Sequence, residues 1–296
     1  MSRLPDRGEA SRAFRFGIVS TMRDPLNIHA WLEHNRNLGV RRFFITVDRS
    51  PWLVVYLLSQ RDVSVRHCEH DIVGYEFWNI QSQHVNAFLD DMSEYHISHV
   101  LHIDDDELIH VNARDDFVRL MTSDPSVLCW CLQNLEALAE NENVTSPFSE
   151  CRLFCTNKTQ FAAYANGKSI GYVERGARCA GAHRFSGKEM WVPPNTAVVL
   201  HFDSIVLRRF RKKMEKYRRE NGREQCRTKR IPFKFYCDAI NASTPNVLKV
   251  WHNYKRYEPG RHKVLFINPR FQAPAMVIVG NTPMKGKYGA LIDAFP

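Results

Sequence analysis

Four consecutive acidic residues, Asp104 to Glu107, form the group in this sequence best suited to bind a cation. They follow the apolar stretch 97–103, which predicts a strand that ends in a turn. Carboxylates this close repel one another and raise one another's pKa, so they are stable only when solvated, partly protonated or bound to a cation. Because side chains alternate along a strand, we expect Asp104 and Asp106 to point one way and Asp105 the other. Two carboxylates on one face predict a site for Mg²⁺ or Mn²⁺, and an acidic surface turn is the alternative.

The segments that must position these acids alternate between strand and helix. The expected strands are 14–20, 42–48, 63–67, 97–103, 127–132 and 198–202, and the expected helices are 27–38, 51–58, 77–95 and 113–121. This alternation predicts an α/β fold with a mostly parallel sheet, in which ligands bind beyond the carboxyl ends of the strands. After the acidic residues the regular alternation of strands and helices ends, and mixed loops follow up to about residue 190. Residues 231–296 contain seven prolines and predict an extended tail that wraps the domain.

The composition indicates a globular protein with room for one large core or two modest ones, since 44% of its 296 residues are hydrophobic. It contains no apolar run of about 18 residues, and its first ten residues lack the apolar core of a signal peptide. Eight cysteines without a C-x-x-C pair favour reduced thiols and a cytoplasmic location. A zinc site is a weaker hypothesis, and it would need Cys151, Cys155, Cys179 and His183 to meet in space.

The net charge of +9 is concentrated in one segment, because twelve Lys or Arg residues lie between 208 and 230. Leu207, Phe210, Met214 and Tyr217 recur there at spacings of three and four, which predicts an amphipathic helix with a solvated basic face. The same charge would also suit nucleotide phosphates, an anionic membrane surface or nucleic acid.

The order of several motifs resembles that of GT-A glycosyltransferases, near the family 2-like and family 92-like groups. The segments that carry the resemblance are the loop 19–24, the helix 30–39 (AWLEHNRNLG), the strand ending at Asp48, a helix with Gln81 and Gln83, the DxD-like segment 102–109 (HIDDDELI), and the later segments 164–170, 181–185 and 200–204. The resemblance spans roughly residues 14–216. It implies a Rossmann-like, mostly parallel sheet flanked by helices, a flexible N-terminus over 1–13, and a basic and extended C-terminal region over 217–296 that packs on the domain.

The resemblance also implies roles for individual residues. Asp104 and Asp106 would hold Mn²⁺ or Mg²⁺, which would act on the departing diphosphate, and His201 would add a ligand or end a strand. The nucleotide-sugar, with UDP as the expected nucleotide, would contact Thr21, Arg23, Asp48, Asp105 and Lys212.

An inverting transfer also needs a carboxylate that takes the proton of the acceptor hydroxyl. Glu136 and Glu150 are the first candidates, while Asp203, Glu174 and His183 are alternatives. A retaining mechanism needs no such base, and the sequence leaves that choice open.

We therefore expect a metal-dependent glycosyltransferase that acts on a glycan or another hydroxyl acceptor, without specific nucleic-acid binding and with peripheral membrane contact through the basic helix as an option. The alternatives are a metal-dependent phosphodiesterase or nuclease, and a non-enzymatic polyanion-binding protein.

Overall fold

The computed structural model describes residues 14–69, 76–269, 276–279 and 282–284. Contacts divide the chain into unit 1, which is residues 1–133 with 166–199, and unit 2, which is residues 134–165 with 200–296. The boundary predicted at residue 216 falls inside α8 (Leu207–Arg219), so the contact division does not follow it. The predicted flexible N-terminus lies outside the described residues.

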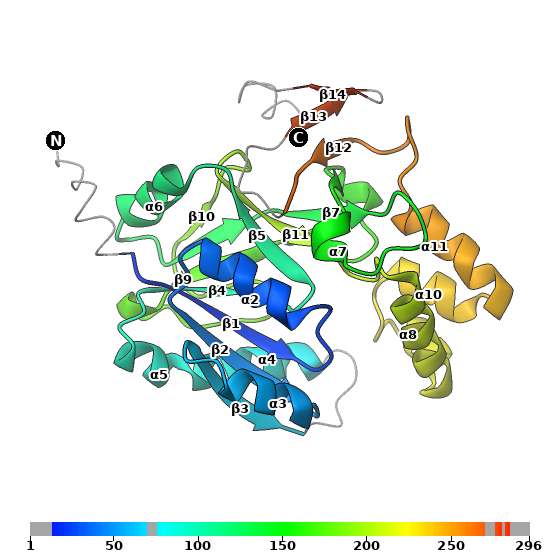
Figure 1. The fold of residues 1–296 in the computed structure, drawn as a ribbon. Coiled ribbons are helices and arrows are strands. Elements are labelled where there is room, and N and C mark those ends of the chain that lie inside the picture. The colour runs from blue at the N-terminus through cyan, green and yellow to red at the C-terminus, as the bar shows by residue number, and fades with distance from the viewer. Residues whose placement is uncertain (1–13, 70–75, 270–275, 280–281, 285–296) are drawn as a thin grey trace. The chain divides into compact units, whose positions relative to one another are not determined.

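Unit 1 contains a seven-stranded sheet with the order β10-β6-β9-β4-β1-β2-β3. Its strands are β1 (Phe16–Met22), β2 (Arg42–Asp48), β3 (Val63–Cys68), β4 (His99–His102), β6 (Cys129–Leu132), β9 (Lys168–Tyr172) and β10 (Glu189–Trp191). Its helices are α2 (Ile28–Asn37), α3 (Pro51–Leu58), α4 (Glu76–Ala87), α5 (Leu89–Glu94), α6 (Arg114–Ser123) and the 3₁₀ turn η2 (Val173–Arg175). In Figure 1, α2 and α3 lie in front of the central strands and α4 lies behind them.

The pairing in this sheet confirms the predicted α/β class with a mostly parallel sheet. β1 pairs in parallel with both β2 and β4, β2 pairs in parallel with β3, and β10 does so with β6. β9 is the exception, because it runs antiparallel to β4 and β6. The chain order reverses between β1 and β4, and in open α/β sheets ligands bind beside the carboxyl ends of the strands at such a switch point.

The predicted helix over 27–38 forms as α2, with its start and stop signals in place. The side chain of Asn27 accepts a hydrogen bond from the backbone N–H of Ala30 at 3.0 Å, which satisfies one of the free donors at the helix start. Gly39 follows the helix with φ of +86°, a conformation that favours glycine. The indole of Trp31 is buried and donates to the carbonyl of Glu107 at 2.8 Å, which ties α2 to the strand after the acidic residues.

Two expectations for unit 1 are wrong in detail. The helix predicted over 77–95 is interrupted at Phe88, where α4 gives way to α5. The strand predicted over 97–103 ends at His102, so the acids lie in a turn between β4 and β5 (Glu107–Val111). The alternation of strand faces therefore does not apply to Asp104, Asp105 and Asp106.

Unit 2 has its own strands and a group of helices. The described strands are β7 (Asn134–Leu138), β8 (Leu153–Cys155), β12 (Val264–Phe266), β13 (Met276–Val279) and β14 (Thr282–Met284), in the order β14-β13-β12-β8-β7. The helices are α7 (Pro147–Glu150), α8, α9 (Gly222–Arg227), α10 (Lys234–Asn241) and α11 (Val247–Lys255), with 3₁₀ turns η1 (Lys158–Gln160) and η3 (Thr244–Asn246). β11 (Ala197–His201) runs across the chain boundary between the units and corresponds to the strand predicted over 198–202.

The prediction of an extended tail over 231–296 is wrong where α10 and α11 form. Pro232 lies before α10 and Pro245 lies between the two helices, while Phe235, Ala239 and Ile240 bury one face of α10. A disulfide between Cys226 and Cys237 joins α9 to α10, so the expectation of reduced thiols is wrong for this pair. Among the described residues, no helix has the length and apolar character needed to span a membrane.

Candidate functional site

Two residues of the acidic turn after β4, Asp104 and Glu107, contact a buried lysine of unit 1. Lys168 lies on β9 with its side chain fully buried, and its Nζ donates to Asp104 Oδ2 at 2.6 Å and lies 3.4 Å from Glu107 Oε2. The other oxygen of the Asp104 carboxylate accepts from the Gln81 amide at 3.1 Å. Glu107 is also buried, and its carboxylate accepts from the backbone N–H of Asp104 at 2.7 Å. The turn is thus held in one conformation by contacts to α4, β9 and its own backbone.

The ionisation of this group follows from the lysine. Burial alone would raise the pKa of the Asp104 carboxyl, but the charge and hydrogen bond of Lys168 lower it to about 2. Burial would lower the pKa of Lys168, but Asp104 and Glu107 raise it above its ordinary value. These groups are therefore fully charged near neutral pH.

Two histidines, the buried His102 and the partly buried His183, stay neutral beside this ion pair. Burial, with a further contribution from Lys168, lowers the pKa of His102 to about 3 and that of His183 to about 4. His183 Nδ1 hydrogen-bonds the carbonyl of Gly167 at 2.8 Å, next to the lysine in the chain. Neutral histidines add no charge that would compete with a bound cation.

The residues of the turn fit a hard divalent ion. Asp104, Asp105, Asp106 and Glu107 place four carboxyl groups together in the chain, and the single amine of Lys168 contacts two of them. Each oxygen of Asp104 accepts one of the hydrogen bonds described above, and a carboxylate oxygen has two lone pairs. Mg²⁺ and Mn²⁺ are commonly held by one or two carboxylates and completed by substrate oxygens and water. The predicted third ligand, His201, belongs to unit 2, and its role as a ligand stays a prediction.

A second group of predicted residues lies at the carboxyl ends of β1 and β2. Arg23 follows β1, and its Nε donates to Asp48 Oδ2 at 2.9 Å. Asp48 is buried at the end of β2, where Arg49 also lies 3.6 Å from its other oxygen. Thr21, near the end of β1, is buried with its hydroxyl 3.4 Å from His84 Nδ1. The structure therefore brings Arg23 and Asp48 together, in the same unit and on the same sheet as the acidic turn.

The first candidate for the base, Glu136 on β7, is a buried carboxylate of unit 2. Its oxygens accept from the backbone N–H groups of Ala162 at 2.5 Å and Ala163 at 3.0 Å. They also lie 3.5 Å from Lys255 Nζ and 3.7 Å from His201 Nδ1. Burial opposes ionisation, but Lys255 and His201 outweigh it and lower the pKa of Glu136. A lowered pKa and 1% exposure suit a structural anchor better than a proton acceptor, whose pKa should lie near the working pH.

The other candidates for the base lie in different surroundings. Glu150 ends α7, is exposed, and accepts from the hydroxyl of Thr145 at 3.0 Å and the N–H of Ser146 at 2.7 Å. Glu174 is a surface residue that pairs with Arg15 at 2.7 Å. No observation singles out either one as a base, and their roles stay predictions.

Asp203, another alternative, is buried in a network with Tyr236 of α10 and Lys213 of the basic helix α8, while the role of His183 as a base stays a prediction. The hydroxyl of Tyr236 donates to Asp203 Oδ2 at 2.6 Å and accepts from Lys213 Nζ at 2.7 Å. Burial opposes ionisation of Asp203, but Lys213 and Lys255 hold its pKa well below the usual range. Lys212, predicted to contact the nucleotide-sugar, is exposed. The neighbouring Lys213, and not Lys212, takes part in this network. Lys213 follows the buried Phe210 by three residues, and this helical spacing predicts that Lys213 lies on the inner face of α8.

The predicted zinc group of four residues does not form, because the described residues contain one group of three or more His, Cys, Asp or Glu ligands within 4.8 Å, and that group is Cys129, Cys131 and Glu189.

Comparisons with known proteins do not assign an activity. No protein-family profile matches the sequence, and no curated protein is similar to it. Among solved structures, CMP:2-keto-3-deoxy-manno-octonic acid synthetase complexed with CTP aligns with a TM-score of 0.27 and 14% identity over 43% of this chain and 54% of the synthetase. HddC from Yersinia pseudotuberculosis aligns with a TM-score of 0.29 and 8% identity over 64% of this chain and 78% of HddC. The chain thus spans about half of the synthetase, and similarity this distant transfers no function.

Proposed function

We propose that the chain is a metal-dependent glycosyltransferase that moves a sugar from a nucleotide-sugar, with UDP as the expected nucleotide, to a hydroxyl acceptor. The observation that carries the proposal is the acidic turn Asp104–Glu107, which follows β4 at the switch point of a mostly parallel sheet. Ligands bind at this position in open α/β sheets, and negative charge there selects a cation and through it a phosphate group.

Asp104 and Asp106 would hold Mg²⁺ or Mn²⁺ at this turn. When bound, the ion supplies positive charge to the diphosphate that leaves the sugar. Lys168 does not contact the donor in this proposal, since its side chain is fully buried beneath the carboxylates. Instead it fixes Asp104 in place and keeps that carboxylate ionised, so the site is organised before substrate arrives.

The nucleoside would lie toward β1 and β2. Asp48 can accept a hydrogen bond from a uracil N–H or a ribose hydroxyl, and Arg23, 38% exposed, can donate to a phosphate. The ion pair between them holds each side chain at the sheet edge. Asp105 is half-buried and could contact ribose or the donor sugar, as the resemblance implies.

The inverting course of the transfer depends on a base that the described residues do not single out. Glu136 and Glu150 stay candidates for this base on the evidence of the sequence alone. Measuring the anomeric configuration of the product would decide between the inverting and retaining courses.

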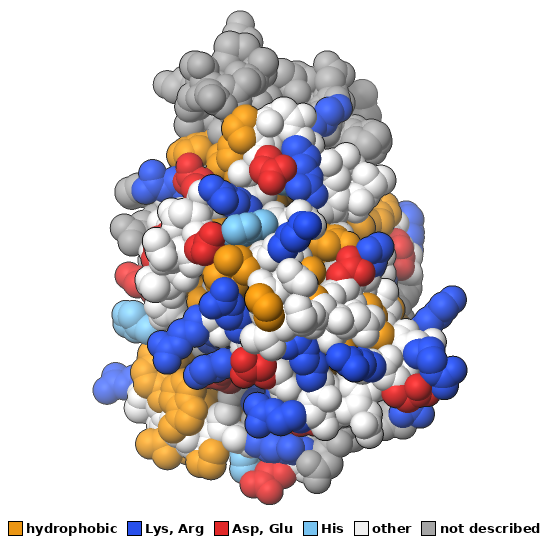
Figure 2. Space-filling model, turned by 90° about the vertical axis from the view of Figure 1, so that its right-hand side faces the viewer, with side chains coloured by type: hydrophobic (Ala, Val, Ile, Leu, Met, Phe, Trp, Pro, Cys, Tyr) orange, Lys and Arg blue, Asp and Glu red, His pale blue; other side chains and the backbone are white. Residues whose placement is uncertain are grey.

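Binding of a polyanion through α8 is the second candidate, because one specific observation favours it. The exposed face of α8 consists largely of basic residues, namely Arg208, Arg211, Lys212, Lys216 and Arg219. The predicted apolar stripe is confirmed, since Leu207, Phe210 and Met214 are buried. Figure 2 shows groups of Lys and Arg side chains, with Asp and Glu between them, on the side of the molecule that carries α8. The charges suit phosphate groups of a membrane surface or a nucleic acid, and such binding would weaken steeply with salt.

Donor hydrolysis tests the first proposal. The full chain is incubated with a panel of nucleotide-sugars and Mn²⁺, and the released nucleoside diphosphate is measured. We expect release from one class of donor, loss of release in Asp106→Ala, and no loss in Asp116→Ala, which removes an exposed carboxylate of α6 paired with Arg119. Full activity in Asp106→Ala would reject the metal site.

A further inference from the structure

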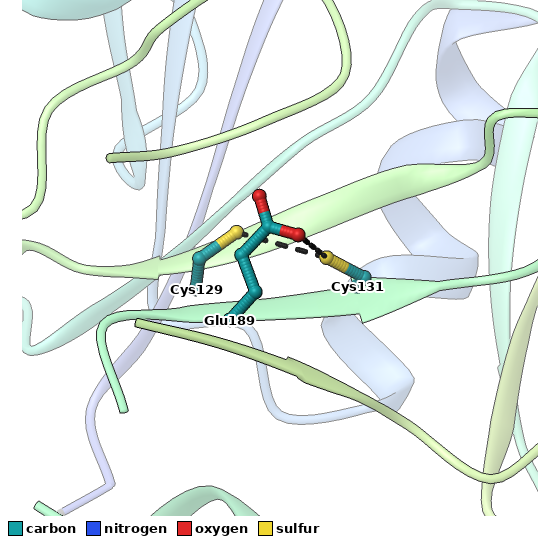
Figure 3. A group of neighbouring side chains, drawn as sticks. All are labelled: Cys129, Cys131 and Glu189. Atoms are coloured by element: carbon teal, nitrogen blue, oxygen red, sulfur yellow. Dashed lines mark hydrogen bonds between the residues drawn. The ribbon is translucent and has the colours of Figure 1, made fainter. Parts of the chain in front are cut away.

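A second cluster of metal-binding side chains lies in unit 1, on β6 and β10. Cys129 and Cys131 are two residues apart on β6, so their side chains share one face of the strand. Glu189 of the neighbouring parallel strand β10 pairs in register with Cys129. Figure 3 shows the carboxylate of Glu189 reaching toward the two sulfur atoms.

The distances in this cluster match the edges of a metal tetrahedron. The two Sγ atoms lie 3.9 Å apart, and Cys131 Sγ lies 3.7 Å from Glu189 Oε2. Zinc binds thiolate sulfur at about 2.3 Å and carboxylate oxygen at about 2.0–2.2 Å, so a tetrahedral site has S···S edges of about 3.8 Å and S···O edges of about 3.5 Å. These two edges need shifts of only a few tenths of an ångström to hold an ion, and the third edge, between Cys129 and Glu189, is within 4.8 Å.

The surroundings also suit a borderline-soft ion. Both thiols are fully buried in a core that includes Val100 and Phe185, where water does not compete for the sulfur atoms. Glu189 is exposed at the edge of the sheet, where β10 is the outermost strand, so one ligand of the cluster is in contact with solvent.

We propose that Cys129, Cys131 and Glu189 form a three-ligand site for Zn²⁺, with water as the fourth ligand. Binding would convert the two thiols to thiolates and release two protons to solvent, with the carboxylate of Glu189 as the third protein ligand. This site is separate from the acidic turn, whose oxygen ligands select harder ions.

Cobalt binding tests the proposal in the full chain, because tetrahedral Co²⁺ reports thiolate ligands through a sulfur-to-metal charge-transfer band. The chain is stripped with a chelator under reducing conditions and titrated with Co²⁺ and then with Zn²⁺. We expect one Co²⁺ per chain with the charge-transfer band, and complete displacement by one Zn²⁺.

Variants identify the ligands. Cys131→Ser should lose the band, and Glu189→Gln should weaken Co²⁺ binding at least about tenfold. Cys151→Ser, which changes a buried free cysteine of unit 2, and Asp106→Ala should both retain the band unchanged. If Cys131→Ser does not fold, comparison of Co²⁺ binding by the wild type and Glu189→Gln tests the site. Glu189 is exposed, so its substitution should not disturb the core. Absence of the band in the wild type, or unchanged affinity in Glu189→Gln, would overturn the proposal.

Discussion

The buried lysine beneath the acidic turn gives the sharpest prediction about stability. Lys168 Nζ lies 2.6 Å from the Asp104 carboxylate and 3.4 Å from that of Glu107, and the side chains of Lys168 and Glu107 are fully buried. Lys168→Met keeps the volume but leaves two carboxylates without their cation. Removing one partner of a buried ion pair costs about 3–5 kcal/mol, and the 25% exposure of Asp104 places this case near the lower value.

Urea unfolding, followed by tryptophan fluorescence, measures this loss. With a slope of about 3 kcal/mol per molar urea, a loss of about 3 kcal/mol lowers the midpoint by about 1 M. The double variant Lys168→Met/Glu107→Gln should recover part of the loss, because it removes one of the two orphaned charges. Lys188→Met is the matched control, since Lys188 is 58% exposed and pairs with Asp124 at the surface. Equal midpoint shifts in the Lys168 and Lys188 variants would refute the reasoning.

Three further predictions concern other parts of the chain. Burial lowers the pKa of His99 to about 3, so the unfolded chain binds a proton that the native state does not, and stability falls as pH drops from about 6.5 to about 3. His99→Gln should flatten this slope by up to about 1.4 kcal/mol per pH unit in acid titrations of stability, and an unchanged slope would contradict the assignment. Tyr236→Phe removes the hydroxyl between Asp203 and Lys213 and should cost about 1–3 kcal/mol in urea unfolding, whereas no loss would mean that the network is not a stabilising one. Peptide mapping without reductant should recover α9 linked to α10 through their disulfide, and two alkylated cysteines there would contradict the structure.

Much of the parallel sheet could be predicted, because local pattern determines its elements. Strand β2 occupies the predicted residues 42–48, and α2 has the predicted stop at Gly39. The acidic turn was found for the same reason, since its four residues are consecutive in the chain.

Long-range partners could not be predicted in this way. Lys168 is 64 residues from Asp104, and nothing local in its strand marks it as the counter-ion of the turn. Two signals conflict at α10 and α11. The prolines near their ends predict an extended chain, whereas the helical spacing of Phe235, Ala239 and Ile240 predicts a helix, and the structure follows the spacing. The Cys129–Cys131–Glu189 group also needs two strands to pair, so the sequence alone does not reveal it.

Calorimetry of UDP binding tests the central claim most directly. UDP is titrated into the full chain with and without Mn²⁺, and again into Asp106→Ala, with single-stranded DNA as a second ligand. The proposal predicts UDP binding that requires Mn²⁺ and is lost in the variant. Salt-sensitive DNA binding together with no UDP binding in the presence of Mn²⁺ would contradict it and favour the polyanion-binding alternative.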